Sequence, residues 1–277
     1  MSDINRRRVL TTLGGAVTVG LAGCAGGGDG GDGDGGDGDG GDGGDDGDGT
    51  DSPDGDGMET DMDGGTGTET PSDTAQVRAA HMSPDAPNVD VYVDGNAALE
   101  DVPFRAVSDY LEVPAGPHQF TITEAGNQDN AVFDQEVTLE TEDYTLVAAG
   151  ELTSEDTDFQ VLPLVDDNSD PGGNQARLRA VHVSPDAGAV DVTVSAGAVL
   201  FDGVEFTDAG SVSVEANDYT AEVRPDTMDN DGEVVYDADV SLNGGTVYTA
   251  FASGYLSPDD DPADEAFELT VVQDASI

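Results

Sequence analysis

The sequence contains no lysine and no tryptophan, and only one of its 277 residues is cysteine. A single cysteine excludes both a disulfide framework and a cysteine-based zinc site. The eight basic residues, all arginine, face 60 acidic residues and leave a formal net charge of -52. Because nucleic-acid binding needs clustered basic side chains to neutralise phosphates, this balance excludes nucleic acid as a partner. No apolar run reaches the roughly 20 residues that a membrane-spanning helix needs.

The first 23 residues have the organisation of an export signal. Arg6 to Arg8 precede a short apolar stretch that ends at Ala22, which resembles the twin-arginine pattern. Leu21-Ala22-Gly23-Cys24 resembles a lipobox, in which the cysteine is lipidated and becomes the new N-terminus. An ordinary signal peptide with an incidental cysteine is the alternative. The resemblance to lipoproteins implies a two-chain lipid on Cys24, which anchors a protein stably without spanning the bilayer. We therefore expect residues 1–23 to be removed and the mature protein to be held at the extracytoplasmic face of the cell membrane.

Residues 24–75 have the composition of a tether. This stretch is rich in Gly and Asp, drifts into Thr, Ser and Pro, and contains no basic residue. Such a segment buries too little apolar surface to offset its ordering entropy, which predicts a disordered acidic linker. Repeated Asp-Gly also resembles calcium-loop chemistry, but a calcium loop holds its carboxylates at fixed positions, and here their spacing is irregular.

The rest of the chain consists of two copies of one unit. His81-x-Ser83-Pro-Asp85 recurs as His182-x-Ser184-Pro-Asp186, an offset of 101 residues, and neighbouring segments match at similar offsets. We assign repeat 1 to residues 76–167 and repeat 2 to 176–277, and 168–175 is a linker because it is rich in turn residues.

Apolar and polar residues alternate with a period of two in both repeats. Val89, Val91 and Val93 alternate with polar side chains, as do Phe120 and Ile122. This alternation is typical of half-buried antiparallel strands. With turn residues at short intervals, it predicts an all-β protein: two tandem immunoglobulin-like antiparallel β-sandwich domains of about seven strands each, after the disordered acidic linker.

The acidic excess and the missing lysine indicate adaptation to a hypersaline medium. Self-repulsion destabilises a compact polyanion at low salt, whereas molar salt reduces the Debye length to about 3 Å and screens it. A charge selected for a basic partner is the alternative, but that would not explain the absence of lysine.

Four segments of repeat 1 resemble the domain of unknown function 4397 family: His81–Ala86, Val89–Val91, Val102–Phe104 and Tyr110–Gly116. The resemblance covers residues 76–275 and is weaker in repeat 2. It implies an extracytoplasmic β-rich module and supplies no catalytic residues. Together with the export signal, it suggests tandem copies of this domain in a haloarchaeal twin-arginine-exported lipoprotein.

The repeated motif supplies the candidate ligand contacts, His81, Ser83, Asp85, His182, Ser184 and Asp186. A nucleophilic triad would need Ser bonded to His and His bonded to Asp, beside an oxyanion hole. Ser-Pro-Asp is also an ordinary turn, because Pro fixes φ and Asp can accept from a nearby backbone N–H. Since no nucleophile elbow accompanies the motif, we expect no catalytic residue, and a turn beside a packed histidine is the favoured interpretation.

Metal and cofactor sites have little support in the sequence. Asp229, Asp231 and Glu233 form the best local calcium candidate, but the remaining loop positions and the flanking helices are absent. We therefore expect no cofactor, with weak Ca²⁺ binding as the open alternative.

These observations favour a non-catalytic cell-surface lipoprotein, a binding or structural module whose partner is a surface glycan or protein. An extracytoplasmic envelope enzyme using the His-x-Ser-Pro-Asp motifs, or a surface calcium- or solute-binding protein, is the alternative.

Overall fold

The computed structural model describes residues 73–153 and 157–276. The predicted export signal (1–23), the lipid attachment residue Cys24 and all but the end of the predicted tether (24–75) lie outside these residues. Among the residues that are described, no helix has the length and apolar character to cross a membrane.

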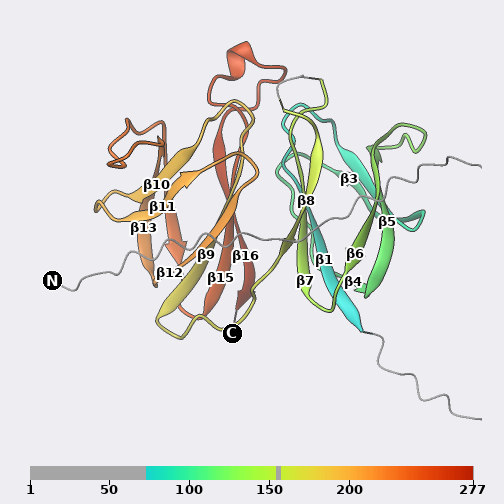
Figure 1. The fold of residues 1–277 in the computed structure, drawn as a ribbon, viewed down its shortest axis with the longest axis horizontal. Coiled ribbons are helices and arrows are strands. Elements are labelled where there is room, and N and C mark those ends of the chain that lie inside the picture. The colour runs from blue at the N-terminus through green and yellow to red at the C-terminus, as the bar shows by residue number, and fades with distance from the viewer. Residues whose placement is uncertain (1–72, 154–156, 277) are drawn as a thin grey trace, which may run out of the picture. The chain divides into compact units, whose positions relative to one another are not determined.

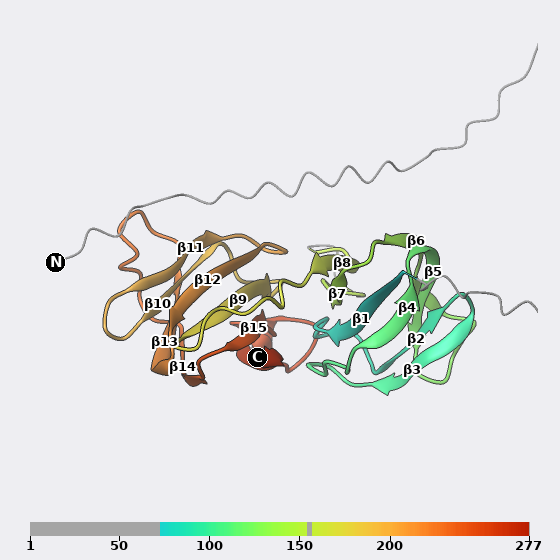
Figure 2. The same ribbon diagram turned by 90° about the horizontal axis from the view of Figure 1, so that it is seen from below.

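The first repeat folds into two four-stranded sheets, drawn from blue-green to yellow-green in Figure 1. One sheet has the order β4-β1-β7-β8, and Figure 2 shows β4 beside β1. Its strands are β1 (Thr74–His81), β4 (Leu111–Pro114), β7 (Asp143–Ala149) and β8 (Gln160–Val165). The other sheet has the order β3-β2-β5-β6. Its strands are β2 (Val89–Val93), β3 (Asn96–Val102), β5 (Gly116–Glu124) and β6 (Ala131–Leu139).

The second repeat has the same two sheets in the same order, drawn from yellow to red (Figure 1). The sheet β12-β9-β15-β16 corresponds to β4-β1-β7-β8. Its strands are β9 (Gln175–Val183), β12 (Ala209–Glu215), β15 (Thr246–Ser253) and β16 (Glu268–Ser276). The sheet β11-β10-β13-β14 is built from β10 (Val190–Val194), β11 (Val199–Val204), β13 (Asn217–Pro225) and β14 (Tyr236–Leu242). A short 3-10 helix, η1 (Pro258–Asp260), precedes β16.

Each repeat encloses its own hydrophobic core between its two sheets. In repeat 1, Val77 and Leu146 from one sheet lie in a cluster with Phe120 from the other. In repeat 2, Leu178 and Tyr248 lie in a cluster with Phe201. Alternate residues of each strand point into these cores, so burial of apolar surface between the sheets holds each sandwich together.

The all-β prediction with two tandem β-sandwiches is confirmed, and the structure adds two details. Each repeat has eight strands instead of about seven. The edge strand β3 buries only Val102 fully, so alternation in its sequence is weak. Each repeat also contains one parallel pair, β1 with β7 and β9 with β15, within otherwise antiparallel sheets. Strand direction does not follow from the period of a sequence pattern, and the parallel pairing was therefore not predictable from it.

Candidate functional site

The His-x-Ser-Pro-Asp motif lies at the end of the first strand of each repeat. His81 is the last residue of β1 and is paired in register with Ala148 on β7. His182 occupies the same place near the end of β9, opposite Ala252 on β15. The Ser-Pro-Asp segments follow directly, so each motif leads out of a central strand into the turn that crosses to the second sheet.

Both histidines are buried and bonded to backbone. The Nε2 atom lies 3.1 Å from the carbonyl oxygen of Pro87 in His81 and 3.0 Å from that of Gly188 in His182. Because a carbonyl can only accept, Nε2 carries the proton. Burial lowers the pKa of both imidazoles below 6.5, and the bonded carbonyl oxygens oppose this effect. The histidines are therefore neutral packed side chains at physiological pH.

Each serine hydroxyl donates a hydrogen bond to a backbone carbonyl just after the neighbouring strand, β7 or β15. Ser83 Oγ donates to Gly150 O at 2.7 Å, and Ser184 Oγ donates to Gly254 O at 2.5 Å. Both serines are completely buried. Neither hydroxyl donates to a histidine, and a nucleophilic serine needs such a bond to lose its proton.

The aspartates complete a clamp on the loop after β7 or β15. The carboxylate of Asp85 accepts hydrogen bonds from the backbone N–H groups of Leu152 and Thr153, the latter at 2.7 Å, and from the hydroxyl of Thr153. Asp186 accepts from the N–H groups of Leu256 and Ser257, at 2.9 and 2.8 Å. The motif thus fastens two loops of the same sheet to one another.

The cavities beside the histidines are too small for a substrate. The core of repeat 2 contains a cavity of about 40 Å³, lined by His182 and otherwise by apolar side chains. The corresponding cavity beside His81 has about 30 Å³. Ligand pockets have volumes of roughly 300 to 1,000 Å³, so these are packing gaps of about the size of a water molecule.

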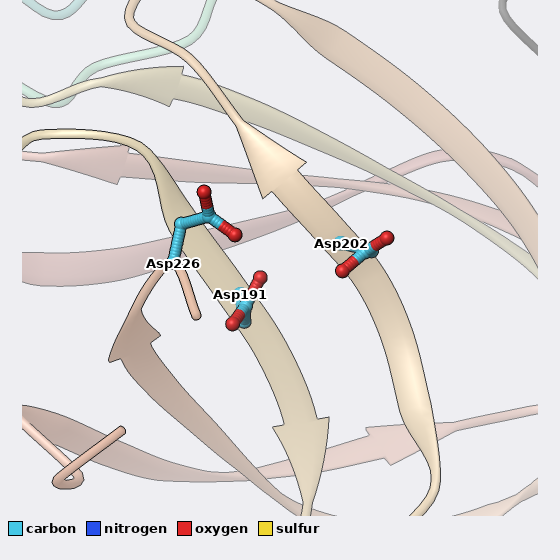
Figure 3. A group of neighbouring side chains, drawn as sticks. All are labelled: Asp191, Asp202 and Asp226. Carbon is cyan, nitrogen blue, oxygen red and sulfur yellow. The ribbon is translucent and has the colours of Figure 1, made fainter. Parts of the chain in front are cut away.

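Three carboxylates of repeat 2 lie close together at the sheet β11-β10-β13-β14 (Figure 3). Asp191 on β10, Asp202 on β11 and Asp226 after β13 each offer an oxygen within 4.8 Å of the others. The Asp191 carboxylate is completely buried and accepts from the N–H groups of Gly203 and Thr227. Asp202 accepts from the side-chain amide of Asn230.

The environment of this acidic group favours the protonated form of one of its three carboxylates, Asp226. Desolvation of its carboxyl group, followed by the nearby carboxylates of Asp191 and Asp202, raises the pKa of Asp226. Carboxylate oxygens are the ligands that Ca²⁺ prefers, so this is the place in the described residues where a divalent cation has three candidate donors. This group was not predictable from the sequence because its members lie on β10, on β11 and just after β13, and only the fold brings them together.

The residues that the sequence suggested as weak calcium ligands are not part of that group. Asp229, Asp231 and Glu233 lie in the loop between β13 and β14. The backbone N–H of Asp231 donates to the hydroxyl of Thr227, so this loop is organised by its own side chains.

Both repeats also contain a buried carboxylate that was not among the candidate residues of the sequence. Asp90 accepts from the N–H groups of Asp101 and Gly126, both at 2.8 Å, and these bonds lower its pKa. Asp191 makes the equivalent bonds in repeat 2. The repeated Val-Asp-Val was the signal, since an acid between two core valines in both copies needs internal partners.

A family model described as Domain of unknown function (DUF4397) matches residues 75–193. The matched segment contains β2–β8 and all of β1 except Thr74, which together form the first sandwich, and it continues through β9 into β10. No curated protein matches the chain.

Several solved structures resemble the chain at low identity. The family-26 carbohydrate-binding module CBMbc of Eubacterium rectale Amy13K, solved with maltoheptaose, is 9% identical, with 73% of this chain and 97% of that chain covered and a TM-score of 0.23. The Bacillus anthracis TIE protein is 10% identical, with 65% of this chain covered, 34% of its own length and a TM-score of 0.22. A proposed cell adhesion protein from Bacteroides fragilis is 11% identical, with 73% and 98% covered and a TM-score of 0.19. At such TM-scores these likenesses carry no argument about function.

Proposed function

We propose that this protein is a non-catalytic binding or structural module of the cell surface, anchored by a lipid on Cys24. The observation that supports a non-catalytic role is the hydrogen bonding of the repeated motif. His81, Ser83 and Asp85 each bond to a backbone group of their own repeat, and their counterparts in repeat 2 do the same. A side chain that fastens the fold in this way is not available to a substrate.

A turnover assay tests this role directly. Residues 73–277 would be incubated in multimolar KCl with chromogenic esters, phosphates and glycosides, beside a heat-unfolded sample as the control. We expect no turnover above that control. Turnover that disappears in Ser83→Ala or Ser184→Ala, while the far-UV circular dichroism is unchanged, would instead establish the envelope enzyme.

The partner is a glycan or protein of the cell envelope under this proposal. Immobilised residues 73–277 should retain a defined component from envelope extract at native salt, and bait unfolded beforehand should not. Retention of the same components by folded and unfolded bait would identify charge alone as the cause and count against a binding module.

The anchor and the medium are further parts of the proposal. Mass spectrometry of the membrane-extracted protein should find a lipid-modified Cys24 as the first residue, and an unmodified residue there contradicts the anchor. In multimolar KCl, circular dichroism should show β structure that is lost on dilution, because a formal charge of -52 repels itself without screening. Undiminished β structure in dilute buffer would contradict adaptation to high salt.

We also propose that the second repeat is a further copy of the DUF4397 domain. The equivalent sheet orders of the two repeats and the equivalent clamps at Ser83 and Ser184 support this extension beyond the matched residues 75–193.

A further inference from the structure

The central strands of one sheet in each repeat are buried on both faces. All eight residues of β15 are buried, so the alternation of an ordinary half-exposed strand is absent. Tyr248 and Ala250 point into the core of repeat 2, and Thr249 between them points to the opposite face. In β1, Val77 points into the core of repeat 1, whereas Arg78 on the opposite face is also buried. Something outside each sandwich covers this second face.

The second faces of the two repeats cover each other within one compact unit. A single apolar cluster combines side chains of both repeats. It consists of Ala80, Met82, Val147 and Ala149 from repeat 1 with Val181, Val183 and Phe251 from repeat 2. Every one of these side chains is 1% exposed or less. The pairing face is therefore the outer surface of β1 and β7 in repeat 1 and of β9 and β15 in repeat 2.

Two reciprocal ion pairs cross the pairing face. Arg78 of repeat 1 donates through Nη2 to Asp274 Oδ1 of repeat 2 at 2.6 Å. Arg179 of repeat 2 lies with its Nη1 2.6 Å from Asp166 Oδ1, at the end of repeat 1. Arg78 and Arg179 occupy equivalent positions in the two repeats, as do Asp166 and Asp274.

A threonine of each repeat connects its arginine to its own aspartate. Arg78 Nε donates to Thr145 Oγ1 at 2.8 Å, and this hydroxyl donates to Asp166 at 2.7 Å. In repeat 2, Arg179 Nε donates to Thr249 Oγ1 at 3.0 Å. The Thr249 hydroxyl in turn donates to Asp274 at 2.6 Å. Each repeat thus carries the complete Arg, Thr and Asp set, and the arrangement has the reciprocity of a two-fold interface.

Three of the few cationic side chains of the two repeats bond across the pairing face. Only five arginines follow residue 72, and there is no lysine to replace them. Arg78, Arg105 and Arg179 all bond across the pairing face, Arg105 through the carbonyl oxygens of Ser253 and Ala266. Buried ion pairs are costly unless fully bonded, and their best-attested benefit is to specify which surfaces pair.

We propose that the pairing face is a self-complementary docking surface whose partner is a second copy of the same repeat. Within the chain, the sister repeat occupies it. In an isolated repeat 1, Arg78 of each copy would meet Asp166 of the other, so two copies would pair through the same face. Two copies of repeat 1 would lack Phe251 and the bond from Tyr255 to Glu151, which makes the pair of unlike repeats the tighter one.

The full chain allows the first test. A protease site between Asp170 and Pro171 would be cleaved in multimolar KCl, and the mass measured by light scattering during gel filtration. We expect one species with the mass of the uncut chain that contains both fragments. Arg78→Gln should release two species, each with the mass of one fragment. The matched control is Arg224→Gln, since Arg224 pairs with Glu222 inside repeat 2, and its halves should stay together. Separation of the unsubstituted halves, or retention in Arg78→Gln, overturns the proposal.

The second test addresses self-pairing. The cleaved halves would be separated in denaturant and repeat 1 refolded alone, which is reasonable because its core lies between its own two sheets. We expect β structure and twice the fragment mass at the highest concentration at which the uncut chain remains monodisperse. A folded monomer contradicts the proposal. An unfolded fragment does so too, since a self-complementary face would hold it folded as a dimer.

Discussion

The hydroxyl of Ser83 donates a hydrogen bond of 2.7 Å to the carbonyl oxygen of Gly150, and the side chain that makes this bond is completely buried. The bond joins the exit of β1 to the exit of β7, two strands that run parallel. Its counterpart joins Ser184 to Gly254 at the same place in repeat 2. A motif that resembles a catalytic constellation in sequence is thus a fastening in the fold, and its energetics can be measured.

Replacement of Asp85 by Ala should destabilise the protein. The substitution leaves the N–H groups of Leu152 and Thr153 without their acceptor, and bonds to a charged group contribute roughly 1.5–3 kcal/mol each before water replaces part of them. We expect a net loss of about 1–3 kcal/mol in the free energy of unfolding, measured by denaturant titration in multimolar KCl. Asp129→Ala, at an exposed position, is the control. Equal stabilities of the two variants would contradict the clamp.

Replacement of Gly254 by Ala should also lower stability. Gly254 has φ +85°, and a Cβ there would lie 2.5 Å from the carbonyl oxygen of Ala266 and 2.6 Å from Arg105 Nη2. The left-handed backbone alone costs an L-residue about 1–2 kcal/mol, and the contacts add to this. A drop of several degrees in the melting temperature is the expected result. Gly173→Ala, where a Cβ meets nothing within 4 Å, should leave the melting temperature almost unchanged.

The buried histidines should make stability depend on pH, and with a known sign. Burial lowers the pKa of His81 in the folded state, so below about pH 6.5 the unfolded chain binds the proton more readily. The contribution of neutral His81 is complete above pH 6.5 and is lost as the pH falls below it. Melting temperatures from pH 8 to 5 should therefore fall less steeply in His81→Gln than in the unsubstituted protein.

His118 provides the control of opposite sign. The hydrogen bond to Asp94, 2.7 Å from Nδ1, raises the pKa of His118. Its contribution is present below pH 6.5 and is lost as the pH rises through the folded-state pKa. His118→Gln should therefore flatten the pH profile above pH 6.5 and leave the acid limb in place. Identical changes in His81→Gln and His118→Gln would refute this account of both residues.

The acidic group on repeat 2 leads to a prediction about salt. Because desolvation and, after it, the charges of Asp191 and Asp202 raise the pKa of Asp226, its ionised form is disfavoured where it lies. Asp226→Asn should raise the melting temperature, and the increase should be largest at the lowest salt at which the protein stays folded. The equivalent position in repeat 1 is Ala125, which shows that the fold does not need a carboxylate there. A decrease in melting temperature after Asp226→Asn would show that the carboxylate has an attractive partner instead.

The sequence allows the sandwiches to be predicted because their strands alternate. Val89 and Val91 face the core, and Asp94-Gly95 forms the predicted turn with both residues at positive φ. The pairing face was not predictable in this way, because Arg78 and Thr145 look like the polar side of half-exposed strands. Two observations reveal a second buried layer. Both side chains are buried, and Arg78 pairs with Asp274, which lies 196 residues further along the chain. An arginine inside an apolar run at the same place in both repeats was the signal available.

The direction of β1 also has a mechanical consequence. The chain enters β1 at Thr74, and the clamped turn begins after His81 at its other end. If the protein is tethered through its N-terminal segment while the loops at the His81 end of β1 bind a partner, a pulling force acts along the length of β1. The hydrogen bonds from β1 to β4 and β7 lie across the direction of that force. They would therefore have to break together and not one after another. A strand loaded in this manner resists extraction far better than one pulled from its edge.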